Sequence, residues 1–161
     1  MFNLKAEFYL KIIFLFSFIA LISAFFIEYI LGHQPCNLCL IERIPYGLSI
    51  MIIMAIFLIR KNQKFLVMLL ILTFIFSFAI SFYHFGIEQS FFQESSVCGV
   101  KSSTEIITKE DLLKQLSEKT ISCKDVTFRI FGLSLTSINI VISLLFIITL
   151  LKIFKKYEKN K

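Results

Sequence analysis

Four cysteines are the residues of this 161-residue chain best suited to chemistry, and they fall into two pairs. Cys36 and Cys39 form a C-x-x-C motif, whereas 24 residues separate Cys98 from Cys123. Such a set can bind zinc through four thiolates, form two structural disulfides, or exchange disulfides with other thiols. Zinc sites of four thiolates commonly use two C-x-x-C motifs, and a disulfide across so short a loop adds little stability. We therefore favour redox chemistry and expect no metal site.

Cys39 has the surroundings of a reactive thiolate. We expect it at the start of a helix, where backbone N–H groups carry partial positive charge, with Arg43 following one turn later. Both features stabilise a thiolate, which is the form that attacks disulfides or electron-poor rings. Cys36 would be its partner in exchange. Arg43 could instead be an interfacial anchor paired with a headgroup, Glu42 or Glu28, but the nearby cysteine favours a functional role.

The elements that position these residues follow from the composition. The chain is 57% hydrophobic and 17% charged, with a mean hydropathy of +0.82, unlike a soluble globule or a disordered chain. Since a span needs about 20 apolar residues, we expect one all-α domain, an integral membrane four-helix bundle. The predicted spans are residues 9–30, 40–59, 65–85 and 135–154. A signal peptide could explain the first, but its apolar stretch continues through Phe25, Phe26 and Ile27, which favours a retained span.

The distribution of charge predicts an orientation. One side of the predicted spans carries ten basic and two acidic residues, net +8, and the other carries seven basic and nine acidic residues, net −2. Basic residues favour the cytoplasmic side, so both termini and the turn at 60–64 are predicted to be cytoplasmic. The loops at about 31–39 and 86–134, with all four cysteines, then face an oxidising compartment. The lysine-rich tail is a topology determinant, and no nucleic-acid partner is expected.

The segment from Cys36 to Gly47, CNLCLIERIPYG, resembles the signature of the DsbB family of bacterial inner-membrane disulfide oxidoreductases. Further similarities are the four spans, the later cysteine pair and two short motifs, Tyr83-His84-x-Gly86 and Phe131-Gly132-Leu133-Ser134. The chain departs from the family pattern in having no tryptophan, and its long loop has no proline. The resemblance implies a multi-pass protein of the bacterial inner membrane whose redox sites face the periplasm.

The resemblance also implies an electron path. A soluble periplasmic thioredoxin-like thiol oxidase of the DsbA type would attack Cys98, and electrons would pass through Cys123 and Cys36 to Cys39. Cys39 would deliver them to a membrane quinone, either ubiquinone or menaquinone, with Arg43 polarising the ring. That role is electrostatically reasonable, because a quinone gaining electrons needs a nearby cation. We expect the protein to act as a monomer.

Two features of the predicted outer side allow more than one role. His84 is expected at the membrane boundary, either as an ordinary interfacial residue or, by the resemblance, as a quinone or proton-transfer contact. In the long loop, Thr108 to Asp111 has the pattern of a capping box that opens a short amphipathic helix through about Glu118. We expect this helix to lie on the bilayer surface and tether the loop, with packing on the bundle or on the partner as the alternative.

Two other functions remain open from the residues. One is a quinone-linked thiol oxidoreductase resembling vitamin K epoxide reductase, where the C-x-x-C motif on the quinone side follows the loop pair, the reverse of the order here. The other is a non-enzymatic membrane scaffold with two structural disulfides. Quinone-dependent oxidation of the cysteines distinguishes the enzymes from the scaffold.

Overall fold

The computed structural model describes residues 4–59, 62–93, 98, 123–124, 129–130 and 133–159. The amphipathic helix predicted between Thr108 and Glu118 lies outside these residues. Most of the described chain forms four long helices, which are α1 (Leu4–Tyr29), α2 (Asn37–Leu58), α3 (Gln63–Glu88) and α5 (Leu135–Lys159). All four are long and apolar enough to cross a membrane. The prediction of an all-helical protein with four candidate spans is confirmed.

The helices extend beyond the predicted spans. α1 begins at Leu4 rather than Tyr9, and α3 continues to Glu88 rather than ending at Phe85. The physical reason is that span prediction counts apolar residues, whereas helix ends are set by backbone hydrogen bonds that polar residues also make. The additional turn of α3 brings both His84 and Glu88 onto one helix.

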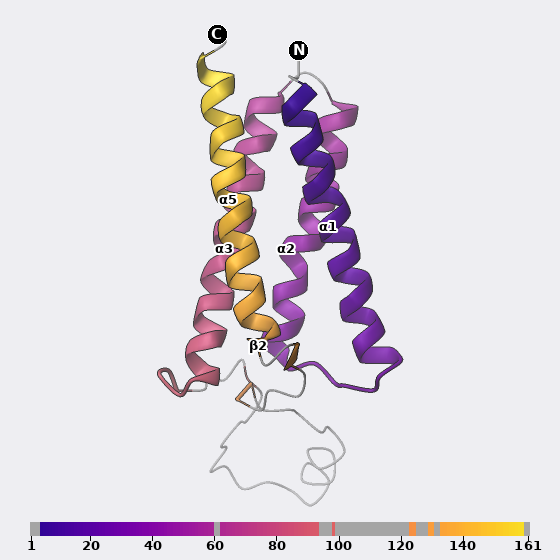
Figure 1. Cartoon of the computed structure of the whole chain (residues 1–161), viewed down its shortest axis with the longest axis vertical. Coiled ribbons are helices and arrows are strands. Elements are labelled where there is room, and N and C mark those ends of the chain that lie inside the picture. The colour runs from indigo at the N-terminus through magenta and orange to yellow at the C-terminus, as the bar shows by residue number, and fades with distance from the viewer. Residues whose placement is uncertain are drawn as a thin grey trace, which may run out of the picture.

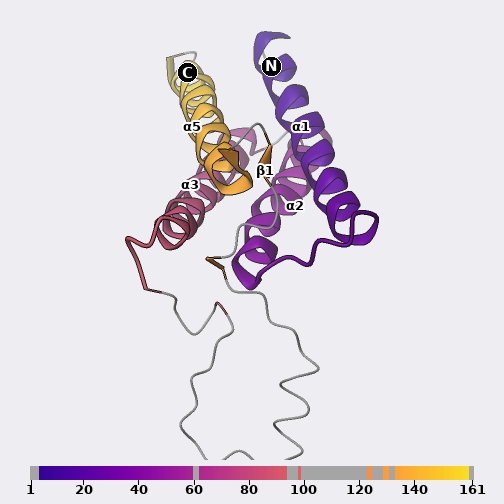
Figure 2. The same cartoon turned by 60° about the horizontal axis from the view of Figure 1, so that its bottom comes forward.

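The helices form an up-and-down bundle with an open side. α1 packs against α2, α2 against α3, and α3 along α5, whereas α1 and α5 barely touch (Figures 1 and 2). Both ends of the chain lie at the same end of the bundle (Figure 1). The C-x-x-C motif opens α2 at the opposite end.

Small polar residues let the helices approach one another. Ser17, Ser49, Ser77 and Ser143 are fully buried. Ser49 Oγ donates to Ser17 Oγ at 3.0 Å between α2 and α1, and Ser143 Oγ donates to Ser77 Oγ at 3.1 Å between α5 and α3. Small side chains with satisfied hydroxyls are typical of helix contacts within membranes. An apolar core that includes the fully buried Phe74 is built from the same four helices.

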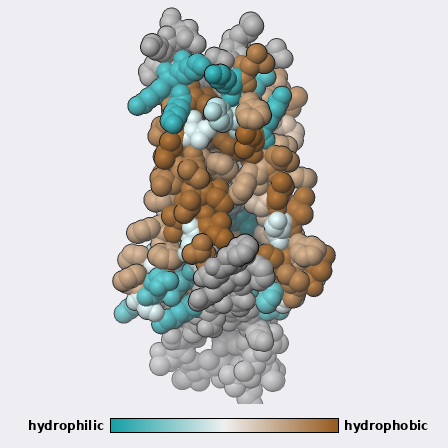
Figure 3. Space-filling model, in the orientation of Figure 1, coloured by the Kyte–Doolittle hydropathy of each residue, from teal (hydrophilic) through white to brown (hydrophobic). Residues whose placement is uncertain are grey.

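The outer surface of the bundle is apolar. Met51 is 71% exposed and Leu58 is 77% exposed, and apolar side chains dominate the middle of the face seen in Figure 3. Hydrophilic side chains gather toward the two ends of that face. A patch of this size is costly in water but suits lipid, because the backbone groups of each helix are satisfied internally.

A short hairpin leads into α5. β1 (Arg129–Ile130) pairs antiparallel with β2 (Leu133–Ser134), with Arg129 opposite Ser134. Ser134 Oγ then accepts a hydrogen bond from the Ser137 amide at 3.2 Å, which satisfies one unpaired donor in the first turn of α5. Strands of two residues show no hydropathy period, so sequence pattern does not predict this hairpin.

Candidate functional site

The C-x-x-C motif occupies the N-terminal turn of α2. Cys36 is the N-cap residue, with extended backbone, and its Sγ accepts a hydrogen bond from the Cys39 amide at 3.3 Å. α2 therefore begins at Asn37, before the predicted start at Leu40, because Cys36 takes the capping role. Cys39 lies inside the first turn, where the helix dipole acts on its sulfur as expected.

The two cysteine pairs meet in one buried cluster. Cys36, Cys98 and Cys123 are 6%, 1% and 2% exposed, and they pack together with Leu38 and Ile87. Cys39 is partly buried and packs against this cluster. Cysteines far apart in the sequence thus lie close enough for thiol–disulfide exchange between the two pairs.

Hydrogen bonding and burial raise the pKa of two of these thiols. The hydrogen bond with Cys39, followed by burial, raises the pKa of Cys36 to about 12, although the contact with His84 lowers it. Burial raises the pKa of Cys123 to about 11, against hydrogen bonds from Cys98 and the Leu38 backbone that lower it. Both groups therefore remain thiols at neutral pH when they are reduced.

His84 lies behind the C-x-x-C motif on α3. Its Nε2 is 3.7 Å from Cys36 Sγ, and its Nδ1 is 2.8 Å from Glu42 Oε1. Thr136 Oγ1 lies 3.3 Å from the same Nδ1. The side chains of His84 and Glu42 are 3% and 12% exposed, so the pair is shielded from solvent. A carboxylate, an imidazole and a thiol are thereby aligned.

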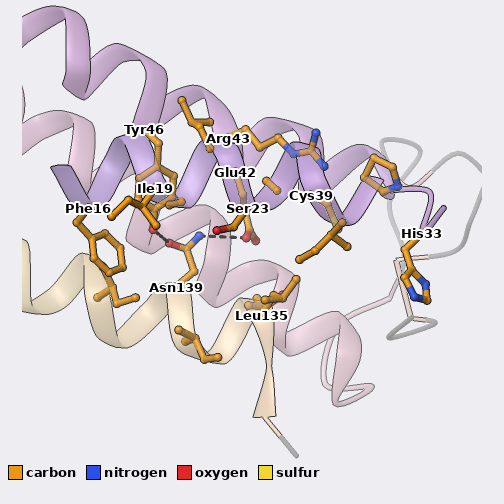
Figure 4. A pocket seen from close by; sticks show the side chains of 18 of the residues that line it. Phe16, Ile19, Ser23, His33, Cys39, Glu42, Arg43, Tyr46, Leu135 and Asn139 are labelled. Atoms are coloured by element: carbon orange, nitrogen blue, oxygen red, sulfur yellow. Dashed lines mark hydrogen bonds between the residues drawn. The ribbon is translucent and has the colours of Figure 1, made fainter. Parts of the chain in front are cut away.

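A polar network extends from Glu42 into the bundle. Asn139 Nδ2 donates to Glu42 Oε2 at 3.0 Å and to Ser81 Oγ at 2.7 Å. The Tyr46 hydroxyl donates to Asn139 Oδ1. Figure 4 shows Asn139 reaching from α5 toward Glu42 and Tyr46 on α2. Both oxygens of Glu42 have partners, so its orientation toward His84 is fixed.

A cavity of about 340 Å³ lies between α1, α2 and α5, and Figure 4 shows side chains that line it. Its walls are mostly apolar and come from α1, α2, α5 and the segment before α2. Cys39 and Arg43 both line it. Residues on its α1 and α5 walls include Phe16, Ile19, Ala20, Ile27, Leu135, Ile138 and Ile142. A flat apolar molecule with polar ring oxygens suits such a lining.

Arg43 is held at the cavity by α1. Its guanidinium forms an ion pair with Glu28 and lies 5.3 Å from the centre of the Phe25 ring. The side chains of Arg43 and Glu28 are 17% and 21% exposed. The sequence offered Glu28 and Glu42 as alternative partners, and the structure pairs the arginine with Glu28.

Gly86 shapes the end of α3. A Cβ atom there would lie 2.1 Å from the Phe92 ring, which stacks on Tyr83 with centroids 5.8 Å apart. The Phe91 and Phe92 amides both donate to the Gly86 carbonyl, at 2.8 and 3.1 Å. The glycine therefore allows the chain to fold back tightly after α3.

The residues predicted from sequence divide between the two sides of α2. Cys36 lies with Cys98, Cys123 and His84, Arg43 lines the cavity, and Cys39 both packs against the cysteine cluster and lines the cavity. His84 is not among the described residues that line the cavity. Sequence reasoning missed the roles of Glu42 and Asn139 in orienting His84. The available signal was a polar Asn139 inside a predicted span, because such residues are costly and are usually paired.

A bundle of four span-capable helices, with two cysteine pairs gathered beside a cavity, defines a membrane thiol protein. Comparison with known proteins makes this class specific. The chain matches the model of the family described as disulfide bond formation protein DsbB over residues 6–153, and it belongs to that family. It is therefore a disulfide-bond formation membrane protein of a family that carries out quinone-linked thiol oxidoreduction.

The chain is also similar to a protein of Rickettsia prowazekii (strain Madrid E) named uncharacterized protein RP370. The two are 31% identical over 147 residues, which cover 90% of this chain and 86% of the relative. No solved structure matches the chain significantly.

Proposed function

We propose that this chain reoxidises a periplasmic thioredoxin-like thiol oxidase of the DsbA type and passes the electrons to a membrane quinone. The observation that carries the proposal is the placement of the C-x-x-C pair between two environments. Cys36 packs with Cys98 and Cys123, whereas Cys39 lines a cavity together with Arg43. This arrangement supports a path from a soluble thiol to a lipid-soluble acceptor.

The proposed exchange begins with Cys98–Cys123 and Cys36–Cys39 as disulfides. A partner thiolate attacks Cys98, the Cys98–Cys123 bond breaks, and its electron pair goes to Cys123. Cys123 then attacks Cys36, which breaks the Cys36–Cys39 bond and leaves the electron pair on Cys39. The second partner thiolate releases the oxidised partner and leaves Cys98 reduced. Attack of Cys98 on Cys123 restores the loop disulfide, so both electrons remain on Cys36 and Cys39.

Proton handling at Cys36 is assigned to His84. Its Nε2 faces the Cys36 sulfur, and Glu42 fixes the ring from the other side. When Cys36 is released as a leaving group or must attack again, the imidazole gives or takes the proton at sulfur. We therefore assign His84 to thiol exchange rather than to direct contact with quinone.

The cavity fits the quinone that the family implies. Its apolar walls suit the ring and the first part of the tail, and the Arg43 guanidinium can stabilise negative charge on a ring oxygen. When bound, a quinone supplies the acceptor for two electrons and two protons. Cys39 lines the same cavity, and its reduced sulfur is the proposed electron donor.

We also propose the orientation that the charge pattern predicts. The lysine-rich end with both termini faces the cytoplasm, and the cysteine end faces the periplasm. The positive-inside rule and the position of both chain ends at one end of the bundle support it. In intact cells lacking quinone, a membrane-impermeant thiol reagent should label the reduced cysteines. Labelling that requires lysis would contradict this orientation.

Trapping of the partner tests the thiol half of the proposal. In a Cys123→Ser variant, the partner attached to Cys98 cannot be displaced by Cys123, so a mixed disulfide should accumulate. Its identification by mass spectrometry should give a thioredoxin-like protein joined to Cys98. A matched Cys98→Ser variant should trap none, and equal trapping in both variants would contradict the assigned entry point.

A purified system tests the quinone half. The full chain in detergent receives a reduced DsbA-type protein and a short-chain ubiquinone or menaquinone analogue. One quinol should form for each partner disulfide, and the change in quinone absorbance measures its formation. If the cysteines stay oxidised whatever the quinone and partner supplied, the chain is a scaffold with structural disulfides and the proposed activity is wrong.

A further inference from the structure

The reduced C-x-x-C motif and His84, which the proposed function uses for thiol exchange, also form a set of potential metal ligands. One ligand atom each from Cys36, Cys39 and His84 lies within 4.8 Å of the others. Cys36 Sγ and His84 Nε2 are 3.7 Å apart. In a tetrahedral zinc site, with Zn–S near 2.3 Å and Zn–N near 2.0–2.1 Å, ligand atoms lie about 3.6–3.8 Å apart. A small contraction of the set would reach that geometry.

The surroundings of His84 favour metal binding independently. A histidine ligand usually donates its second ring N–H to a carboxylate, which fixes the tautomer and leaves the other nitrogen free to bind. His84 Nδ1 lies 2.8 Å from Glu42 Oε1, and Asn139 holds the other oxygen of that carboxylate. In the tautomer with the proton on Nδ1, Nε2 directs its lone pair at the sulfur of Cys36.

A buried carboxylate beside the His84 ring also favours a cation at this site. Glu88 Oε1 is 3.9 Å from His84 Nε2, and its side chain is only 6% exposed. Glu88 Oε2 is buried, and none of the described residues forms a hydrogen bond with it. An uncompensated buried oxygen is costly, and a cation at the adjacent site would offset that cost.

We propose that the reduced protein binds one thiophilic divalent cation, Zn²⁺, through Cys36, Cys39 and His84. Binding converts two thiols to thiolates and releases two protons, with no change in oxidation state. The Cys36–Cys39 disulfide has no thiolate to offer, so the oxidised protein does not bind the ion. The site is thus open only in the reduced state.

The metal and the catalytic cycle exclude each other. An ion bound to Cys39 occupies the sulfur that faces the cavity, and an ion bound to Cys36 blocks exchange with Cys123. Zinc should therefore act as a reversible inhibitor of the reduced enzyme. This consequence depends on the proposed function, whereas binding itself does not.

Binding is measured without quinone or partner, so it can fail or succeed separately from the proposed function. The full chain in detergent is reduced with a phosphine, desalted without air, and titrated with Zn²⁺ against a chromophoric chelator. One equivalent should bind to the reduced form and none to the oxidised form. Co²⁺ in the same site should give thiolate charge-transfer bands and the d–d bands of a tetrahedral ion. Equal binding by the oxidised form would overturn the proposal.

Variants identify the ligands. His84→Ala should weaken Zn²⁺ binding at least tenfold, and His84→Cys should restore it, which guards against a variant that merely misfolds. Glu42→Gln should weaken binding about 10–100-fold, as expected for loss of a carboxylate that orients a ligand. A Cys98→Ser/Cys123→Ser double variant should bind as the parent does. Unchanged binding in His84→Ala, or lost binding in the double variant, would assign the ion to other ligands and contradict the site.

Discussion

The two faces of the first turns of α2 are opposite in character. On the α3 face, Cys36 is buried among sulfur and apolar side chains, with His84 beside it. On the face toward α1 and α5, Cys39 borders a cavity, and Arg43 is held there by Glu28. One face is closed and packed, whereas the other has room for a molecule. Under the proposed function, a single helical turn would separate thiol exchange from electron delivery.

This separation means that the two half-reactions can be damaged one at a time. Residues of the packed face should affect oxidation of thiols, and residues of the cavity face should affect reduction of quinone. A variant that damages both equally would show that the two faces act as one site.

Cys39→Ser removes the sulfur proposed as the electron donor, and it should have the largest effect on one half-reaction. We expect quinone reduction to fall by about a thousandfold or more, because the group that delivers the electrons is gone. The change in quinone absorbance, driven by a small dithiol, measures it. Cys98→Ser is the matched control, since it removes a sulfur of the packed face and should leave dithiol-driven quinone reduction within about twofold. Normal turnover of Cys39→Ser would exclude this sulfur as the donor.

Arg43→Gln removes the cation from the cavity while leaving all four sulfurs. Loss of one preorganised charge beside a reacting oxygen costs about 10²–10³-fold in rate, so quinone reduction should fall by that factor. Single-turnover oxidation of the partner should change far less. The double variant Glu28→Gln/Arg43→Gln controls for the carboxylate left unpaired. Equal losses in both half-reactions would make the arginine structural.

Gly86→Ala acts on the packed face. The added methyl group meets the Phe92 ring and must displace it from Tyr83, which we expect to cost about 1–3 kcal/mol of stability. A lower thermal midpoint in detergent measures this loss. The double variant Gly86→Ala/Phe92→Ala should recover part of it, because the clashing ring is absent. A midpoint that does not fall would show that the turn after α3 has room to adjust.

Glu28→Gln should have the smallest effect, and it tests what the ion pair with Arg43 contributes at the cavity. The arginine keeps its charge but loses its ion pair, so the KM for quinone should rise about 3–10-fold, with a free-energy cost of about 1 kcal/mol. Steady-state kinetics at several quinone concentrations measure the change. Glu7, in the first turn of α1, offers a control: Glu7→Gln should leave the KM unchanged. A fall in partner oxidation with an unchanged KM would place Glu28 outside the cavity's function.

The sequence predicts the architecture well because a bilayer imposes simple rules. Runs of about 20 apolar residues indicate the spans, and the C-x-x-C motif followed by Arg43 indicates the reactive turn. The helix bounds differ from the predicted spans where polar residues continue a helix, as at Lys5 and Glu88. The periplasmic orientation and the loop helix stay predictions.

The internal arrangement of the site could not be predicted from spacing. Whether Cys36 or Cys39 faces a cavity depends on the packing of α1 and α5 against α2. The pairing of Glu42 with His84 likewise requires knowledge of how α2 and α3 are rotated about their axes. A residue pattern along one helix fixes which side chains share a face but not what that face meets.

The N-cap at Cys36 links sulfur chemistry to the backbone. Its sulfur accepts the amide hydrogen of Cys39, as a serine oxygen does at many helix starts. Formation of a disulfide bond changes the electron density and the direction of that acceptor, and reduction returns it. Under the proposed function, each cycle would weaken and re-form the N-cap hydrogen bond of this helix, and amide exchange at Cys39 would record the oxidation state of its own side chain.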